Sequence, residues 1–150
     1  MDKDIVNILV INGPNLNMLG NRDSDYYGTK TLSDSLQYCR ETSEMLGVSI
    51  SSFQSNSEGD IIKYIQDNVS DSAGIIINAG ALTHYSHALS DALTDAKLPV
   101  VEVHISNVYS REKYRSKSVI TALSIGQVAG LGWRGYGYAI ELIFQHLKGT

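Results

Sequence analysis

The sequence predicts an α/β fold in which helices cover both faces of a five-stranded parallel sheet. Three observations lead to this prediction. Short apolar runs, rich in β-branched residues, alternate about five times with longer amphipathic segments along the 150 residues. Most of these runs lack a polar residue at every second position, which is typical of strands buried on both faces. The segments between them are long enough to form the helical crossovers that parallel strands require.

The expected strands are the apolar runs. The first, from Ile5 to Ile11, is apolar apart from Asn7. The fourth contains Pro99 near its start and is interrupted only by Glu102. The second is more polar, as an edge strand is expected to be. In chain order the five strands are predicted at Ile5 to Ile11, Val48 to Phe53, Ala73 to Ile77, Leu98 to Val103 and Ala122 to Ile125.

The expected helices carry apolar residues at helical spacing. Before Ile61 and Ile65, Ser57 and Asp60 form the polar pair that is typical of a helix start. Helices are predicted at Thr31 to Leu46, Ser57 to Val69, Thr83 to Ala96 and Tyr136 to Leu147. With right-handed crossovers, this succession favours a flavodoxin-like strand order of 2-1-3-4-5. A chain of 150 residues is expected to form one domain, residues 1–150.

Composition and charge argue against several classes of protein. The formal net charge of −4 argues against a nucleic-acid partner, whose phosphates attract clustered positive charge. No apolar stretch approaches the ~18 residues of a membrane span, and the chain starts with an acidic segment. We therefore expect a cytoplasmic protein without a membrane partner. The single cysteine, Cys39, cannot close an internal disulfide, and His84 with His87 lacks further ligands, so no metal site is expected.

Polar segments follow the first four expected strands. The carboxyl ends of parallel strands lie at one edge of a sheet, and ligands bind there. The four segments are Asn12-Gly13-Pro14-Asn15, Gln54-Ser55-Asn56, Asn78-Ala79-Gly80-Ala81 and His104-Ile105-Ser106-Asn107. Together they predict a polar pocket that is rich in amides and contains one histidine.

Two further features indicate chemistry at this edge. Glu102 and His104 are two positions apart on a strand, so they point to the same face and the carboxylate can orient the imidazole. Arg22, Arg111 and Arg115 are three of only five arginines, and each is predicted beside the pocket. Arginine pairs well with carboxylates and oxyanions, so the pocket is predicted to bind a small anion.

The first loop, from Gly13 to Lys30, is unusually long. Its 18 residues are expected to lack regular structure, which is typical of an active-site lid. The loop contains Arg22, Tyr26 and Tyr27. A tyrosine beside an arginine is a candidate general base.

Four loop motifs, taken together, resemble those of a known family. They are Asn12-Gly13-Pro14-Asn15-Leu16, Leu19-Gly20-x-Arg22 with Tyr27-Gly28, the segment from Asn78 to His84, and the segment from Glu102 to Asn107 followed by Arg111 and Arg115. In this order and spacing they resemble the type II 3-dehydroquinate dehydratases over nearly the whole chain. The resemblance implies a flavodoxin-like, cofactor-free lyase that dehydrates 3-dehydroquinate to 3-dehydroshikimate through an enolate. It also implies a role in the shikimate pathway of aromatic amino acid biosynthesis or in quinate breakdown, and assembly into a dodecamer of trimers.

The resemblance implies a role for each matching residue in the reaction. Tyr27 matches the base that removes a proton from carbon 2, and Arg22 matches the residue that activates it and stabilises the enolate. His104 matches the acid that protonates the hydroxyl leaving carbon 1, with Glu102 behind it. Asn15 matches the residue that holds a water molecule against the enolate oxygen.

The resemblance also implies a set of substrate contacts. His84 and Arg115 match contacts to the ring hydroxyls, and Asp91 matches a residue that reaches the site of the neighbouring subunit. The contacts to the carboxylate and to the carbon 1 hydroxyl match Asn78, Ile105 and Ser106.

The chain departs from the family pattern in the lid. Family members commonly have a proline where this chain has Ser24, so we expect a more mobile lid here. Tyr26 and Tyr27 are adjacent, and only the following Gly28 identifies Tyr27 as the matching tyrosine.

The alternative is a non-catalytic flavodoxin-like module that binds flavin or a nucleotide. A phosphate loop after the first strand uses free backbone amides and hydroxyls, whereas Pro14 lacks the amide and Asn15 and Leu16 bring no hydroxyl. The segment from Gly130 to Gly135 fits a dinucleotide-binding pattern, but it does not follow the first strand. We therefore expect this segment to be a tight connection with close backbone packing.

Overall fold

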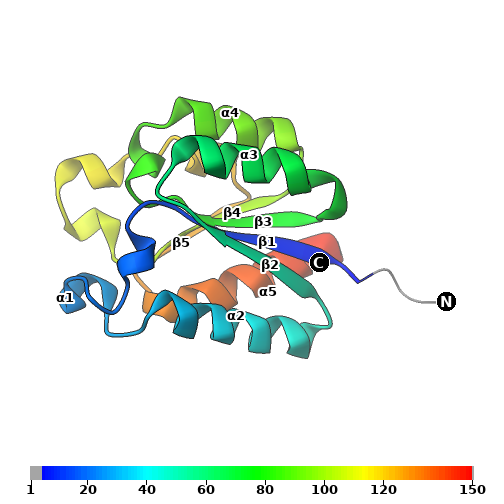
Figure 1. Ribbon diagram of the computed structural model, residues 1–150, viewed down its shortest axis with the longest axis horizontal. Coiled ribbons are helices and arrows are strands. Elements are labelled where there is room, and N and C mark those ends of the chain that lie inside the picture. Colours follow the sequence, from blue (N-terminus) through cyan, green and yellow to red (C-terminus); the bar gives the residue numbers. More distant parts are fainter. Residues whose placement is uncertain (1–4, 150) are drawn as a thin grey trace.

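Five parallel strands form one sheet in the order β2-β1-β3-β4-β5 in the computed structural model, which describes residues 5–149 (Figure 1). This is the predicted flavodoxin-like order. The first, third and fourth strands lie within two residues of their predicted positions, and the second within one. The strands are β1 (Asn7–Asn12), β2 (Ser49–Gln54), β3 (Gly74–Asn78), β4 (Val100–His104) and β5 (Gly126–Ala129).

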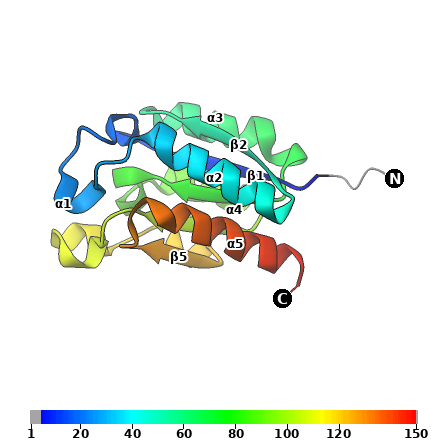
Figure 2. The ribbon, with the colours of Figure 1, turned by 90° about the horizontal axis from the view of Figure 1, so that it is seen from below.

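Helices cover both faces of the sheet, as predicted. On one face lie α3 (Glu58–Asn68) and α4 (His87–Ala96), and on the other lie α2 (Leu32–Leu46) and α5 (Gly135–Leu147) (Figures 1 and 2). In both views α1 (Ser24–Tyr27), coloured blue, and the yellow segment after β4 lie at the same end of the molecule. This end contains the carboxyl ends of the strands.

Side chains of β1 alternate between two buried clusters. Ile8 and Val10 pack into the layer beneath α2 and α5, whereas Leu9 and Ile11 pack into the layer beneath α3 and α4. All four are fully buried, and each contributes about 1.5–3 kcal/mol to the stability of the fold. The run of apolar residues without polar alternation therefore reflects a strand with two buried faces.

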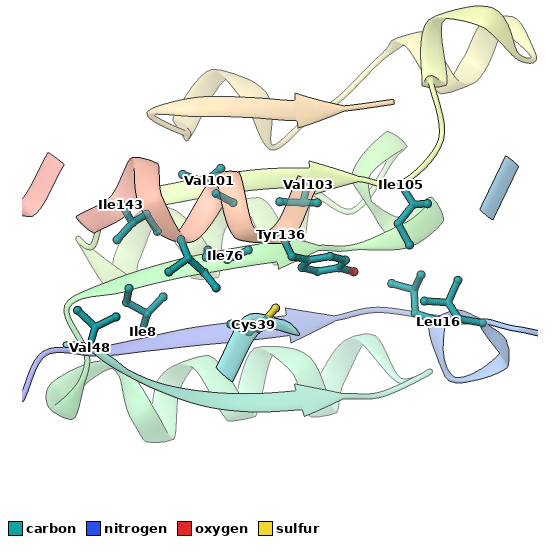
Figure 3. Close-up of a cluster of buried hydrophobic side chains, with 14 residues drawn as sticks. Ile8, Leu16, Cys39, Val48, Ile76, Val101, Val103, Ile105, Tyr136 and Ile143 are labelled. Atoms are coloured by element: carbon teal, nitrogen blue, oxygen red, sulfur yellow. The ribbon is translucent and has the colours of Figure 1, made fainter. Parts of the chain in front are cut away.

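Cys39 of α2 lies in the first of these clusters (Figure 3). It is fully buried, and burial raises the pKa of its thiol to about 12. The cysteine is therefore a packing residue of the core.

Polar caps fix the starts of the helices. The hydroxyl of Thr31 accepts a hydrogen bond from the backbone of Asp34, whose carboxylate accepts one from the backbone of Thr31. The hydroxyl of Ser57 accepts one from the backbone of Asp60. Such caps typically contribute about 1 kcal/mol each. The pair identified in the sequence at Ser57 and Asp60 is confirmed.

The prediction for the fifth strand is wrong by several residues. Thr121–Leu123 forms a 3-10 turn, and β5 begins only at Gly126. The hydroxyl of Ser118 accepts hydrogen bonds from the backbones of Ile120 and Thr121, which favours a turn. The strand β5 is half-buried and lacks the kind of apolar run from which β1, β3 and β4 were predicted.

The third predicted helix starts too early. Gly80–His84 forms 3-10 turns, and α4 begins at His87 because Ser86 is extended and its hydroxyl accepts from the backbone of Leu89. The first loop also contains more structure than expected, with a 3-10 turn at Leu16–Met18 besides α1.

Glycines allow the loops after β1 and β3 to meet. A Cβ atom at Gly13 would lie 2.4 Å from the carbonyl oxygen of Ala79. Gly80 has a φ of +59°, and a Cβ atom there would lie 2.9 Å from the carbonyl oxygen of Pro14. The two loops therefore form one continuous rim at the carboxyl end of the sheet.

The described residues were also compared with the requirements of a membrane span and of a metal site. No helix among residues 5–149 is long and apolar enough to cross a membrane. Within the same range, the His, Cys, Asp and Glu side chains form no group of three or more that could hold a metal ion. The acidic segment 1–4, which argued against a signal peptide, lies outside the described residues.

Candidate active site

A pocket lies at the carboxyl end of the sheet, where the loops after β1, β3 and β4 meet. The structure brings together nine of the eleven site residues predicted from the sequence. Those that line the pocket are Asn15, Arg22, Tyr27, Asn78, His84, His104, Ile105, Ser106 and Arg115.

Two arginines hold the phenol oxygen of Tyr27. Tyr27 ends α1, and Arg22 directly precedes Asp23, which caps that helix. Arg22 donates from Nη2 to the Tyr27 oxygen over 2.9 Å, and Arg111 donates from Nη1 to the same oxygen over 2.8 Å. Two guanidinium groups can therefore hold a phenolate at this position, which is the form of tyrosine that accepts a proton.

Arg111 is the main pocket residue that the predicted site omitted. The sequence indicated it only as part of a positive region. Besides Tyr27, its Nη1 donates to the hydroxyl of Ser106 over 3.0 Å. Tyr27 and Arg111 are 84 positions apart, so their spacing along the chain gave no signal of this contact.

Tyr26 occupies a different place from its neighbour. Its ring is 42% exposed and lies against the guanidinium of Arg111, 4.1 Å from ring centre to Cζ. Tyr27, and not Tyr26, lines the pocket.

In the same pocket, β4 presents His104 and, behind it, Glu102 on one face, as their spacing predicted. His104 Nε2 lies 3.2 Å from Glu102 Oε2, and the Glu102 side chain is fully buried. The buried carboxylate also accepts hydrogen bonds from four other side chains. These donors are Thr83, Ser118, Thr121 and Gln127.

The charge of Glu102 follows from these contacts. Burial by itself raises the pKa of a carboxyl group, but hydrogen bonds from His104, Ser118 and Gln127 outweigh it and lower the pKa of Glu102 to about 2. Glu102 is therefore ionised and can stabilise a protonated imidazole. The sequence showed Glu102 and His104 but not the hydroxyls and the amide around them, because those come from three separate segments.

The loops after β1 and β3 contribute two asparagines. Asn15 has a left-handed backbone, with φ of 70°, and its backbone N–H donates to Asn56 Oδ1 over 2.9 Å. Asn78 is 3% exposed, and its Oδ1 accepts from the backbone N–H of Gly80 over 3.2 Å. Asn tolerates the left-handed region better than most residues, so this turn can present Asn15 at the pocket.

His84 and Arg115 form the outer part of the pocket. His84 Nδ1 lies 2.7 Å from the carbonyl oxygen of Lys117, which can only accept, so Nδ1 carries the proton and Nε2 of a neutral ring is an acceptor. Arg115 Nε donates to Glu112 Oε2 over 2.6 Å. The pair suits a ligand that carries both hydroxyl and negatively charged groups.

Two predicted residues do not line the pocket of this chain. Glu102 lies behind His104, as the resemblance implied. Asp91 is exposed on α4 and is absent from the pocket lining in the described part of the chain. A role for Asp91 in its own subunit's site is therefore not supported by the structure.

Comparison with known proteins identifies the family. The model of the family described as dehydroquinase class II matches residues 6–144. A 3-dehydroquinate dehydratase of Roseiflexus castenholzii is 54% identical over 89% of this chain and 85% of its own length, and one of Halothermothrix orenii is 50% identical over 94% and 95%. The crystal structure of a type II dehydroquinase from Butyrivibrio crossotus superposes with a TM-score of 0.91 at 41% identity, covering 94% of this chain and 99% of the other. With these matches over almost its whole length, and with a shared fold, the chain belongs to the class II dehydroquinase family.

Proposed function

We propose that this protein is a 3-dehydroquinate dehydratase that removes water from 3-dehydroquinate to give 3-dehydroshikimate. The observation that carries the proposal is that two reactive groups line one pocket. Tyr27 is held there by Arg22 and Arg111, and His104 is held by Glu102. Elimination beside a ketone needs a base, charge stabilisation and a separate acid, and these groups supply all three.

In the first step Tyr27, as the phenolate, removes a proton from carbon 2. The electrons of the C–H bond form an enolate, whose negative oxygen is the carbon 3 ketone oxygen. Arg22 and Arg111 stabilise the phenolate before this transfer. Asn15 is at the rim, where it can hold a water molecule against the enolate oxygen.

In the second step the hydroxyl leaves carbon 1. The enolate collapses, a double bond forms between carbons 1 and 2, and His104 gives its proton to the departing oxygen so that water is released. The ionised Glu102 lies 3.2 Å from His104 Nε2, where it can pair with the protonated imidazole that this step needs. Tyr27 then returns its proton to solvent, and His104 takes one up.

The remaining pocket residues recognise the substrate. Asn78, Ile105 and Ser106 lie at the strand ends, where they can bind the carboxylate and the carbon 1 hydroxyl. His84, through its acceptor nitrogen, and Arg115 can contact the ring hydroxyls.

We further propose that residues 1–150 form one cytoplasmic catalytic domain that assembles as a dodecamer of trimers. The single sheet with its two buried clusters supports one domain. Asp91, exposed on α4, is available to a neighbouring subunit. Light scattering on purified protein tests the assembly, and a mass of one or two chains would contradict it.

The function is tested by absorbance at the enone band of 3-dehydroshikimate after mixing 3-dehydroquinate with chelator-treated protein. Absorbance should rise with the wild type and not with Tyr27→Phe. No rise with folded wild-type protein would overturn the proposal and favour a binding module for flavin or a nucleotide. That module is not favoured here, since Pro14 leaves the loop after β1 without one of the backbone amides that a phosphate site uses.

A further inference from the structure

A buried hydrogen-bond chain runs beneath the floor of the pocket. Tyr136, in the first turn of α5, is 1% exposed, and Figure 3 shows its hydroxyl pointing toward the end of the sheet where Leu16 and Ile105 lie. Its oxygen accepts from Asn78 Nδ2 over 3.0 Å and donates to Asn12 Oδ1 over 2.5 Å. The chain therefore connects α5 to the ends of β1 and β3.

The direction of this chain is fixed at one end. The backbone N–H of Gly80 donates to the Asn78 side chain, and since an N–H can only donate, the atom beside it is the oxygen. The nitrogen of Asn78 then faces Tyr136, whose hydroxyl must accept from it. That hydroxyl therefore donates its own hydrogen bond to the oxygen of Asn12. Burial raises the pKa of Tyr136, so the hydroxyl keeps this proton at neutral pH.

Asn12 is held in this orientation at a cost. Its Nδ2 is buried and finds no hydrogen-bond partner among residues 5–149. An unpaired buried polar group destabilises the folded state. The hydrogen bond that the Asn12 oxygen accepts from Tyr136 is the interaction that offsets this cost.

We propose that Tyr136 and Asn12 are positioning residues that fix the amide of Asn78 so that it presents an N–H to the substrate. An amide nitrogen carries two protons, and Tyr136 takes one of those on Asn78. No other described residue accepts from that nitrogen, so the second proton is left for the pocket that Asn78 lines. A reversed amide would present a carbonyl oxygen to the pocket instead, and this oxygen would repel a carboxylate bound beside it.

The inference rests on the proposed function, and the variant Tyr136→Phe tests it. Phenylalanine fills nearly the same core volume but removes the contact to Asn78 Nδ2, so the bond from the Gly80 backbone alone holds the amide. Because a binding contact is lost rather than a step of the reaction, KM for 3-dehydroquinate should rise roughly tenfold while kcat changes less than about threefold. Asn12→Ala removes only the acceptor at the far end and should raise KM in the same direction by a smaller factor.

A double-mutant comparison separates positioning from a structural role. If Tyr136 acts through Asn78, Tyr136→Phe should have no further effect on KM in a protein that already carries Asn78→Ala. Ser43→Ala is the matched control, since its buried hydroxyl donates only to the Arg40 carbonyl within α2. This control should lower the melting temperature without changing KM.

Each outcome decides the inference. An unchanged KM in Tyr136→Phe, or a rise of equal size in the Asn78→Ala background, would overturn it while leaving the dehydratase activity of the wild type in place. A wild type that neither binds nor converts 3-dehydroquinate would remove the proposed function, and the inference with it.

Discussion

The surroundings of His104 and of Tyr27 in the pocket are built in different ways. His104 and Glu102 lie on a central strand, and the carboxylate is fully buried among five donors from the surrounding segments. Tyr27 lies at the end of a single helical turn in a largely exposed loop, and two arginines from separate loops hold its oxygen. The proposed acid is thus fixed by the sheet, whereas the proposed base is fixed by a few contacts between loops. The comparison indicates that the position of His104 depends on the core of the fold and that of Tyr27 on two surface loops.

The largest expected effect comes from removing the proposed base. Tyr27→Phe loses only a hydroxyl, so we expect kcat to fall about 10²- to 10⁴-fold with no change in melting temperature or assembly. Tyr26→Phe is the matched control and should remain near wild type, because that ring is outside the pocket. Steady-state rates of the two variants would decide, and the reverse pattern would assign the base to Tyr26.

The next largest effect should come from removing an arginine that contacts the Tyr27 oxygen. Arg111→Ala removes one of two donors to the Tyr27 oxygen, and we expect kcat/KM to fall about 10²-fold. Arg134→Ala removes the same charge from an exposed position against Trp133 and should leave kcat/KM unchanged. Equal losses in both variants would mean that overall charge, and not the contact with Tyr27, is responsible.

On the acid side, Glu102→Gln should reduce stability as well as activity. The pKa of Glu102 falls from its ordinary value of 4.5 to about 2 on folding. The ionised group therefore contributes ~3 kcal/mol, which is fully present above pH 4.5 and is lost as the pH falls toward 2. Thermal unfolding at pH 7 and pH 3 should show a steeper fall for the wild type than for the variant. Parallel curves would contradict the assignment. We expect kcat to drop at least about tenfold as well.

The smallest effect should come from stiffening the lid. Ser24 is the first residue of α1, a position that proline tolerates because its missing N–H has no partner within a helix. Asp23 has φ of −53° and ψ of 114°, which suits a residue before proline. Ser24→Pro should slow proteolysis of the lid and change kcat less than about threefold, with a gain of ~0.4–1 kcal/mol in lid stability. Faster cleavage in the variant would mean that proline strains the turn.

Much of the fold could be predicted because its signals are local. The strands β1 and β3 are apolar runs with two buried faces, and the start of α3 follows from adjacent polar residues. The fifth strand was missed because an edge strand that begins at Gly126 is half-buried and carries no apolar pattern. A strand buried on both faces therefore gives a clearer signal in the sequence than a half-buried edge strand such as β5.

The candidate site could be predicted only where its residues follow strand ends. Arg111 was left without a role because its contact with Tyr27 depends on two loops that meet in space. Tyr136 was treated only as the start of a helix, since nothing in its surroundings along the chain indicates Asn12 and Asn78. Residues that act through long-range hydrogen bonds can be identified only from the structure.

The buried thiol of Cys39 makes the protein a convenient subject for site-specific labelling. Thiol reagents react with the thiolate, which Cys39 does not form in the folded core. The wild type should therefore remain unlabelled, and a cysteine introduced at Tyr26 would be the single reactive position. A fluorophore attached there would report lid motion directly, and slow labelling of Cys39 itself would measure how often the core beneath α2 opens.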